Sequence, residues 1–148
     1  MRGFLLDTNC ISELVRPRPE ARVVEWIGAV DESILYLSVL TLGEIRKGVA
    51  GLPHGKRKTR IESWLDVDLH ARFAGRIVPI DAAIANRWGL ISAEAKRRGK
   101  VLPVIDGLLA ATALHLNLTV VSRKASDVLN YQAQVLNPWA GTNNKCLP

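Results

Sequence analysis

Short apolar runs alternate with longer amphipathic stretches along most of this chain. A run of about four or five apolar residues, bounded by turn residues, is typical of a strand buried in a parallel sheet. Such runs predict strands at residues 3–6, 34–38, 77–80, 118–121 and 134–136. Apolar residues at helical spacing predict helices at residues 11–15, 20–29, 41–50, 55–65, 81–99 and 106–116. Strands separated by helices favour an α/β fold with a parallel sheet.

Polar residues are expected to begin three of these helices. Asp81 precedes apolar residues at helical spacing, and Gly99 is a typical residue for the end of that helix. Thr41 and Glu44 match the capping box, in which a hydroxyl and a carboxylate each bond to the other's backbone N–H. Asp106 would be the N-cap of an almost uniformly apolar helix, which should be buried on most sides.

Three carboxylates interrupt the most apolar stretches of the chain. Asp7 follows the first strand, Glu44 comes shortly after the second, and Asp106 lies within the apolar residues 101–111. A buried ionised group is costly unless a cation, a metal ion or several N–H donors compensate it. Ligands of open α/β sheets bind beyond the carboxyl ends of the strands, where we expect all three acids. If they converge there, a divalent metal site is the natural interpretation.

Each acid taken alone also has a structural explanation. Asp7 could close its strand with an Asx turn, Glu44 could serve the capping box, and Asp106 could cap its helix. Asp127 lies in a polar segment after a strand, where a solvated loop acid is the usual case. The combination of acids at one sheet edge in a basic protein favours metal-dependent phosphodiester chemistry.

The cysteines and histidines argue against a zinc site. Cys10 and Cys146 lack metal-type spacing, and His54, His70 and His115 are scattered. Cys10 is predicted to be a small buried apolar residue. A metal ion here would therefore be held by oxygen, which points to Mg²⁺ with Mn²⁺ as a substitute.

The composition is that of an ordinary globular protein with a strong basic charge. The chain has 148 residues, enough for one domain with a core, and 48% of them are hydrophobic. The net charge of +6 suits a polyanion, and equally an acidic protein partner. No apolar run is long enough for a membrane span or a signal-peptide core, so we expect a cytoplasmic protein with no membrane partner. Residues 140–148 are expected to form a disordered tail.

Basic residues gather in two places, at residues 46–60 and 96–100. A groove lined with lysine and arginine would neutralise phosphates. Such charge runs more often form solvated helix faces, and the pattern leaves both interpretations open. Arg123 is the strongest single candidate for a phosphate contact, because it follows a strand whose end should face the acids.

At these residues the chain resembles the PIN-domain ribonucleases, and more closely the VapC-type toxins of bacterial toxin–antitoxin pairs, including the FitB-like branch. The resemblance runs from residue 3 to about 139 and implies a PIN-like nuclease domain over residues 1–139. The matching motifs are Leu5-Leu6-Asp7-Thr8-Asn9, Ile11-Ser12-Glu13-Leu14, Thr41-Leu42-Gly43-Glu44-Ile45, Pro103-Val104-Ile105-Asp106-Gly107-Leu108-Leu109-Ala110-Ala111-Thr112-Ala113, Leu118-Thr119-Val120-Val121-Ser122-Arg123 with Asp127, and Val135-Leu136-Asn137-Pro138-Trp139. The family fold implied is a three-layer α/β/α arrangement around a parallel sheet of four to five strands.

The resemblance also implies an activity and its residues. The expected protein is a Mg²⁺- or Mn²⁺-dependent endoribonuclease toxin that hydrolyses RNA phosphodiester bonds with a metal-activated water. The family's metal acids fall on Asp7, Glu44 and Asp106, and Asp127 joins them as a catalytic residue. Further site residues are expected at Thr8, Asn9, Ser38 and Thr112, which would support the acids, and at Arg46, Arg123 and Lys124, which would contact substrate.

One position departs from the common family pattern. Many relatives have Thr-Arg-Asn-x-x-Asp after the last motif strand, whereas this chain has Ser122-Arg123-Lys124-Ala125-Ser126-Asp127. Lys124 could bring a positive charge close to the metal and weaken its binding by about 1–4 kcal/mol near 4 Å. Asp127 would complete the site directly or through water.

The resemblance implies two protein partners, a cognate antitoxin and a second copy of the chain in a homodimer. The apolar residues of Ile11–Val15, Val23–Ile27 and Thr41–Ala50 are candidates for the antitoxin groove, or they simply form the core. A competing hypothesis is a catalytically weak module that binds RNA or antitoxin through a degenerate acidic site. A DNA-directed nuclease of the same architecture is a third possibility.

Overall fold

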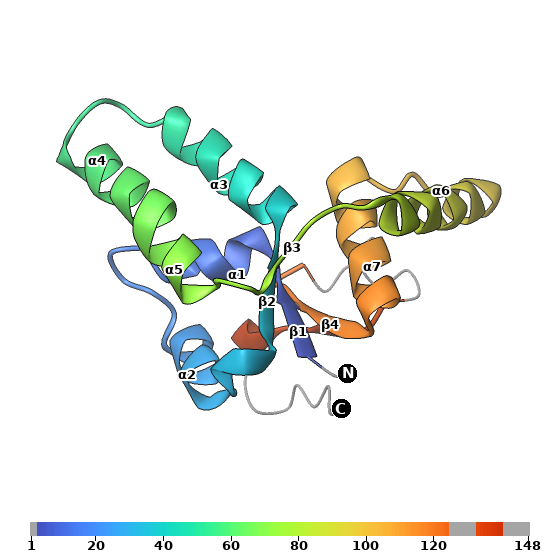
Figure 1. Cartoon of the computed structure of the whole chain (residues 1–148), viewed down its shortest axis with the longest axis horizontal. Helices are drawn as coiled ribbons and strands as arrows, with labels where there is room; N and C mark the ends of the chain where they lie inside the picture. The colour runs from blue at the N-terminus through green and yellow to red at the C-terminus, as the bar shows by residue number, and fades with distance from the viewer. Residues whose placement is uncertain (1–2, 125–132, 141–148) are drawn as a thin grey trace.

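The structure is a computed structural model that describes residues 3–124 and 133–140, with a parallel sheet between two groups of helices (Figure 1). The strands are β1 (Gly3–Leu6), β2 (Leu35–Ser38), β3 (Ile77–Val78), β4 (Leu118–Val121) and β5 (Val135–Leu136). They form a five-stranded sheet in the order β3-β2-β1-β4-β5, and all neighbouring pairs are parallel. The predicted α/β/α fold with a central parallel sheet is confirmed.

The helices divide between the two faces of this sheet. They are α1 (Thr8–Glu13), α2 (Ala21–Ala29), α3 (Val39–Ala50), α4 (Lys56–Ser63), α5 (His70–Arg72), α6 (Ala82–Arg97) and α7 (Val104–Leu116). Figure 1 shows α1 to α5 on one side and α6 with α7 on the other. Two 3₁₀ turns (Glu32–Ile34 and Pro138–Ala140) and a π-helical turn (Trp64–Leu69) complete the described elements.

The strands are apolar on both sides because both faces of the sheet are covered. Leu5 and Leu6 are neighbours in β1, and both are completely inaccessible to solvent. Leu6 packs in the core beneath α1 and α2, whereas Leu5 packs in a second core with Leu109 and Ala113 of α7. Successive side chains of a strand point to opposite faces, so each run of apolar residues serves two cores.

The register of the central strands aligns their carboxyl ends. Leu6 of β1 pairs with Val121 of β4, and the Asp7 N–H donates to the Val121 carbonyl at 2.9 Å. Asp7 and Ser122 are therefore the first residues beyond two neighbouring strands. On the other side of β1, strand β2 ends at Ser38. The chain thus delivers polar residues from three strand ends to one edge of the sheet.

The long helix predicted after Asp81 is confirmed. The Asp81 carboxylate accepts from the Ile84 N–H at 2.9 Å as the N-cap of α6. Gly99 follows the helix with φ at +75°, a conformation that glycine adopts without steric cost. The helix ends at Arg97, two residues before this glycine.

Three helices begin earlier than predicted. The first starts at Thr8 because Asp7 is its N-cap and accepts from the Thr8 N–H at 2.7 Å, in place of the Asx turn. Helix α3 starts at Val39, where the Ser38 hydroxyl accepts from the Leu40 N–H at 3.0 Å. The capping box at Thr41 and Glu44 is therefore wrong, since both residues already lie inside the helix.

The third helix that begins earlier than predicted is α7, and Asp106 is not its N-cap as we predicted. Pro103 caps α7 instead, and its carbonyl accepts from the Gly107 N–H at 2.8 Å. The fixed φ of proline suits the start of a helix. Asp106 lies in the first turn, where the positive end of the helix dipole favours a carboxylate.

The basic helix after Gly55 runs further than its predicted end. It continues from α4 through the π-helical turn into α5 because Leu65, Leu69 and Phe73, spaced four residues apart, are all buried in the core. Strands β3 and β5 are shorter than their predicted ranges. Cys10 is fully buried, as predicted, whereas Cys146 lies outside the described residues.

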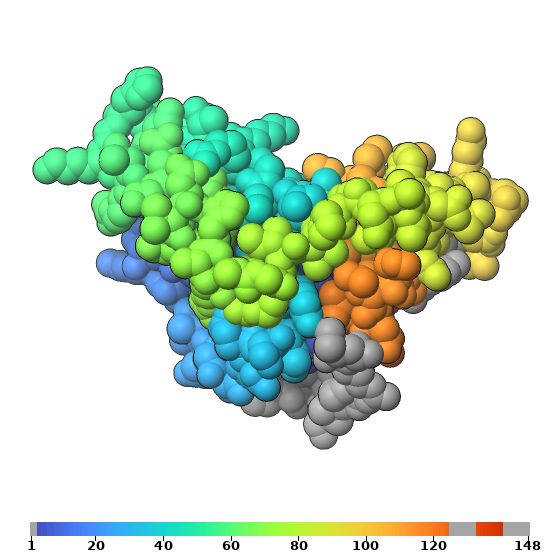
Figure 2. All heavy atoms as spheres, in the orientation of Figure 1, coloured from blue at the N-terminus to red at the C-terminus, as the bar shows by residue number. Residues whose placement is uncertain are grey.

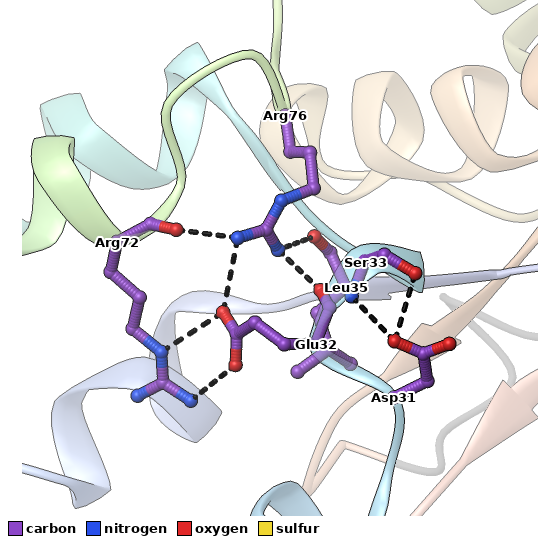
Figure 3. A network of polar contacts seen from close by, with 6 residues as sticks. All are labelled: Asp31, Glu32, Ser33, Leu35, Arg72 and Arg76. Carbon is purple, nitrogen blue, oxygen red and sulfur yellow. Dashed lines mark hydrogen bonds and ion pairs between the residues drawn. The ribbon is translucent and has the colours of Figure 1, made fainter.

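An arginine network holds the opposite end of β2 (Figure 3). Arg76 donates to the Leu35 carbonyl at 2.7 Å and also to the carbonyls of Glu32 and Arg72. Both Arg72 and Arg76 pair with the Glu32 carboxylate, and both guanidinium groups lie over the Phe73 ring. The hydrogen bond from Arg72 is the main reason that the pKa of Glu32 lies below its ordinary value.

Within the described residues, no helix is both long enough and apolar enough to cross a membrane. The disordered tail expected at residues 140–148 lies outside the described residues, except for Ala140, which ends the last 3₁₀ turn.

Candidate active site

Among the predicted acids that the structure describes, Asp7 is the most deeply buried, with 4% of its surface exposed. Its Oδ1 accepts from the Thr8 N–H, and its Oδ2 accepts from the Ser122 hydroxyl at 2.8 Å and from the Asn9 amide at 3.5 Å. These donors are all neutral, so they stabilise the carboxylate without cancelling its charge. A negative charge held this way attracts a cation to the sheet edge.

Ser122 is a site residue that sequence reasoning missed. It is fully buried, donates to Asp7, and accepts from the Lys124 N–H at 3.0 Å and from the Asn9 amide at 3.3 Å. The available signal was its place directly after a strand, the same place that Asp7 occupies. That signal gains meaning only once β4 is known to lie beside β1.

Thr8 and Asn9 connect the Asp7 corner to its neighbours. The Thr8 hydroxyl donates to Oε1 of Glu44, which joins the start of α1 to α3. The Asn9 side-chain oxygen accepts from the Arg123 N–H at 3.3 Å. Both residues therefore lie where the sequence placed them, between Asp7 and the groups around it.

Asp106 joins the site from the other side of the sheet through Lys124. The Lys124 ammonium lies 3.8 Å from Oδ1 of Asp106, whose side chain is 15% exposed. A continuous series of contacts consequently runs from Asp106 through Lys124, Ser122, Asp7 and Thr8 to Glu44. The structure thus brings the three predicted acids to one edge of the sheet.

Ser38 and Thr112 are buried, and both hydroxyls bond to backbone. Ser38 caps α3, the helix that carries Glu44. The Thr112 hydroxyl donates to the Leu108 carbonyl at 2.7 Å within α7, the helix that carries Asp106. These contacts act on the two helices and not on the carboxylates themselves.

The predicted substrate residues occupy different surroundings. Arg46 forms an ion pair with Asp66, and it lies two residues after Glu44, which is close to the opposite side of a helix. The backbone N–H of Arg123 bonds to Asn9 of the site, but its exposed guanidinium lies 5.7 Å from the centre of the Trp139 ring. Lys124 is 59% exposed at the same edge. Asp127 lies outside the described residues.

The donor chemistry of this site fits a hard divalent cation. Carboxylate oxygens are the ligands that Mg²⁺ and Mn²⁺ prefer, and the ammonium beside Asp106 shows that a positive charge is accommodated there. In residues 3–124 and 133–140, no three Asp, Glu, His or Cys side chains are grouped closely enough to hold an ion together. Cation binding therefore requires rearrangement of these side chains or a ligand from elsewhere.

Cys10, one helical turn after Asp7, offers no thiolate to this site. Burial, followed by the negative charges of Asp7 and Glu13, raises the pKa of its thiol to about 12. A protonated thiol is a poor nucleophile and a poor metal ligand. The described side chains that could bind a metal ion at this site are therefore oxygen ligands.

A close contact between helices holds the turn that carries Asp106. A Cβ added at Gly107 would lie 3.0 Å from the side chains of Leu102 and Trp88. At Gly89 of α6, by contrast, an added Cβ would meet nothing within 4 Å. Glycine at position 107 therefore lets α7 approach α6 closely.

We expect Gly107→Ala to lower the free energy of unfolding by about 1 kcal/mol, since overpacking costs about 1–3 kcal/mol and the better helix former returns about 1 kcal/mol. The matched change Gly89→Ala should raise it by up to about 1 kcal/mol. Urea unfolding followed by circular dichroism measures both. A stabilising effect at both positions would contradict the close contact.

The chain is similar to known proteins over most of its length. A model of the PIN domain matches residues 4–125. Toxin FitB of Neisseria gonorrhoeae is 42% identical over 136 residues, which cover 92% of this chain and 98% of FitB. VapC ribonuclease Y4jK of Sinorhizobium fredii is 38% identical over 136 residues, which cover 92% of this chain and 97% of that protein.

Solved structures agree with this comparison. The structure of FitAB bound to an IR36 DNA fragment matches with a TM-score of 0.86 at 40% identity, over 92% of this chain and 95% of the matched chain. DNA-bound VapBC from Salmonella typhimurium matches with a TM-score of 0.75 at 22% identity, over 93% of this chain and 99% of the other, and that likeness shows the shared fold.

Proposed function

This chain belongs to the PIN domain family, and from that membership we propose that it is the ribonuclease toxin of a toxin–antitoxin pair. The names of its relatives, Toxin FitB and VapC ribonuclease, support both halves of the proposal. The observation that carries it is the buried Asp7 carboxylate, which accepts from neutral donors at the sheet edge where Glu44 and Asp106 also lie.

Asp7, Glu44 and Asp106 would hold the divalent ion, which we propose to be Mg²⁺ with Mn²⁺ as a substitute. Asp127 is proposed to assist them directly or through water. When bound, such an ion lowers the pKa of water and stabilises negative charge on a phosphate. The described acids alone form no group close enough to hold an ion, so a contribution from Asp127 or from the RNA would complete the site.

The neutral residues of the site orient its carboxylates. Ser122 and Asn9 contact one oxygen of Asp7, and the Thr8 N–H contacts the other. Thr8 also orients Glu44 through its hydroxyl. These contacts hold Asp7 and Glu44 in defined orientations before the phosphate arrives.

We propose that RNA approaches along the carboxyl edge of the sheet. Figure 2 shows a notch between the arm formed by α3 and α4 and the arm formed by α6 and α7. Lys124 lies beside Asp106 and is proposed to contact a phosphate. Arg123, whose backbone bonds to Asn9, is proposed to do the same once its guanidinium turns from Trp139. Arg46 is a weaker candidate, because it would first have to leave Asp66.

An antitoxin is the proposed protein partner, and a second copy of the chain is proposed to complete a homodimer. Five apolar residues of the predicted groove wall are buried in the core: Ile11, Val23, Ile27, Ile45 and Val49. Val15, which belongs to the same predicted wall, lines an open pocket of about 630 Å³ between the loop after α1 and helix α4, where we propose that the antitoxin docks.

This pocket combines apolar side chains with three arginines. Its lining includes Val15, Pro17, Ile61, Trp64, Arg16, Arg57 and Arg60. Asp68 is the acidic residue in the lining, so positive charge dominates. An antitoxin segment with acidic and apolar side chains would complement this surface.

A second candidate function is supported by the Lys124–Asp106 ion pair. A cation from the protein itself beside one acid suits a module that binds RNA or antitoxin without cutting RNA. Metal-dependent stabilisation discriminates the two functions, because an inactive module with a filled acidic site gains nothing from a divalent ion.

The test of the proposed function is cleavage of a mixed RNA pool by the purified, antitoxin-free protein. We expect fragments with Mg²⁺ or Mn²⁺, none with chelator, and none from Asp106→Asn. A parallel single-stranded DNA pool measures whether DNA is preferred. A folded protein that cuts neither pool and shows no rise in melting temperature with Mg²⁺ or Mn²⁺ would favour the binding module.

A further inference from the structure

Lys124 contacts the acidic site in two ways. Its backbone N–H donates to the Ser122 hydroxyl at 3.0 Å, and that hydroxyl donates to Asp7. Its side-chain ammonium lies 3.8 Å from the Asp106 carboxylate. The backbone of Lys124 is therefore anchored beside one acid while its charge is placed beside another.

The Lys124–Asp106 ion pair differs in its cation from the other ion pairs of the described residues. All of those use arginine, whereas Lys124 supplies an ammonium. A guanidinium forms fixed, planar pairs with carboxylates, but an ammonium is a strongly hydrated point charge on a flexible stem. With 59% of its side chain exposed, Lys124 can leave Asp106 for water at little cost.

We propose that Lys124 is an exchangeable counter-cation of the acidic site, which the divalent ion must displace in order to bind. This inference rests on the proposed function, because it assigns a role to Lys124 toward the metal of that site. The ammonium compensates Asp106 when no metal is present and lowers the affinity of the site for the divalent ion. Once displaced, it remains beside the site, where it can contact a phosphate of the RNA.

The expected magnitude follows from Coulomb's law. A unit charge about 4–5 Å from a divalent ion weakens the binding of that ion by roughly 20–30-fold even in water. Because Lys124 can swing outward, part of this repulsion is relieved when the metal binds. The loss of the lysine charge should therefore tighten metal binding by about tenfold.

The test is a Mn²⁺ titration of the full chain, in which electron paramagnetic resonance follows the free ion and Mg²⁺ is then added as a competitor. Lys124→Ala should bind both ions about tenfold more tightly than the wild type. Lys124→Arg keeps the charge and should not show this gain. Lys56→Ala removes the same charge at the start of α4, on the other arm of the molecule, and should bind the metal as the wild type does (Figure 1).

Thermal unfolding supplies a second readout that does not depend on activity. In chelator, Lys124→Ala should melt at or slightly below the wild-type temperature, and in Mg²⁺ it should gain more stability than the wild type. Equal metal affinities for the wild type and Lys124→Ala would overturn the counter-cation role and leave the metal site intact. An absence of binding in both proteins would overturn the metal site itself, and the proposed nuclease function with it.

Discussion

Asp7→Asn is expected to lower RNA cleavage by about 10³-fold or more while the protein stays folded. The change removes a charge that is almost fully buried at the proposed metal site. A loss of about 4 kcal/mol of transition-state stabilisation corresponds to that factor, since each ~1.4 kcal/mol changes a rate tenfold. The measurement is the rate of fragment formation from the RNA pool in Mg²⁺.

The contacts of Asp7 explain why the fold should survive this change. An asparagine oxygen can still cap α1 by accepting from the Thr8 N–H. Its amide can donate to the Ser122 hydroxyl in place of the Asn9 amide after that hydroxyl rotates. Removal of a buried charge also relieves its desolvation cost. In chelator, the melting temperature should therefore equal or exceed that of the wild type, while the rise caused by Mg²⁺ should disappear.

Asp31→Asn is the matched control, because it is the same chemical change at an exposed cap before β2, at the opposite end of that strand from the acids. It should retain cleavage and the response to Mg²⁺. Full cleavage by folded Asp7→Asn would remove Asp7 from the proposed catalytic set. A large loss of stability in chelator would instead mean that the carboxylate serves the fold.

Arg76→Leu should lower the free energy of unfolding by about 2 kcal/mol. Arg76 is 17% exposed, and its guanidinium satisfies three backbone carbonyls as well as the Glu32 carboxylate (Figure 3). A hydrogen bond to a charged group contributes about 1.5–3 kcal/mol, and partial exposure and the new leucine contacts reduce the sum. Urea unfolding monitored by circular dichroism gives the value directly.

Arg72→Leu separates the carbonyl contacts from the ion pair. Arg72 pairs with the same carboxylate and lies over the same Phe73 ring, but its guanidinium is 38% exposed and makes its described hydrogen bonds to Glu32 alone. Its loss should cost less than about 1 kcal/mol. Equal effects of the two changes would show that the Glu32 pair, and not the backbone carbonyls, holds the start of β2.

The site was predicted best where its residues follow directly from local pattern. Asp7 follows a short apolar run that fits a buried strand, so its position at the sheet edge follows from the alternation of strands and helices. The helix starts were less accurate, because several residues could serve as caps. Ser38 is the N-cap in place of Thr41, and Pro103 is the N-cap in place of Asp106. Glu44 and Asp106 therefore lie inside their helices.

The sequence by itself determined the element order, the α/β class and the three acids that lie in apolar surroundings. Periodicity and capping act over a few residues, so they can be read from neighbours along the chain. Only the tertiary structure decided that β4 lies against β1, which brings Ser122 and Lys124 to Asp7 and Asp106. That pairing joins segments more than a hundred residues apart, and it depends on the packing of both cores of the molecule at once.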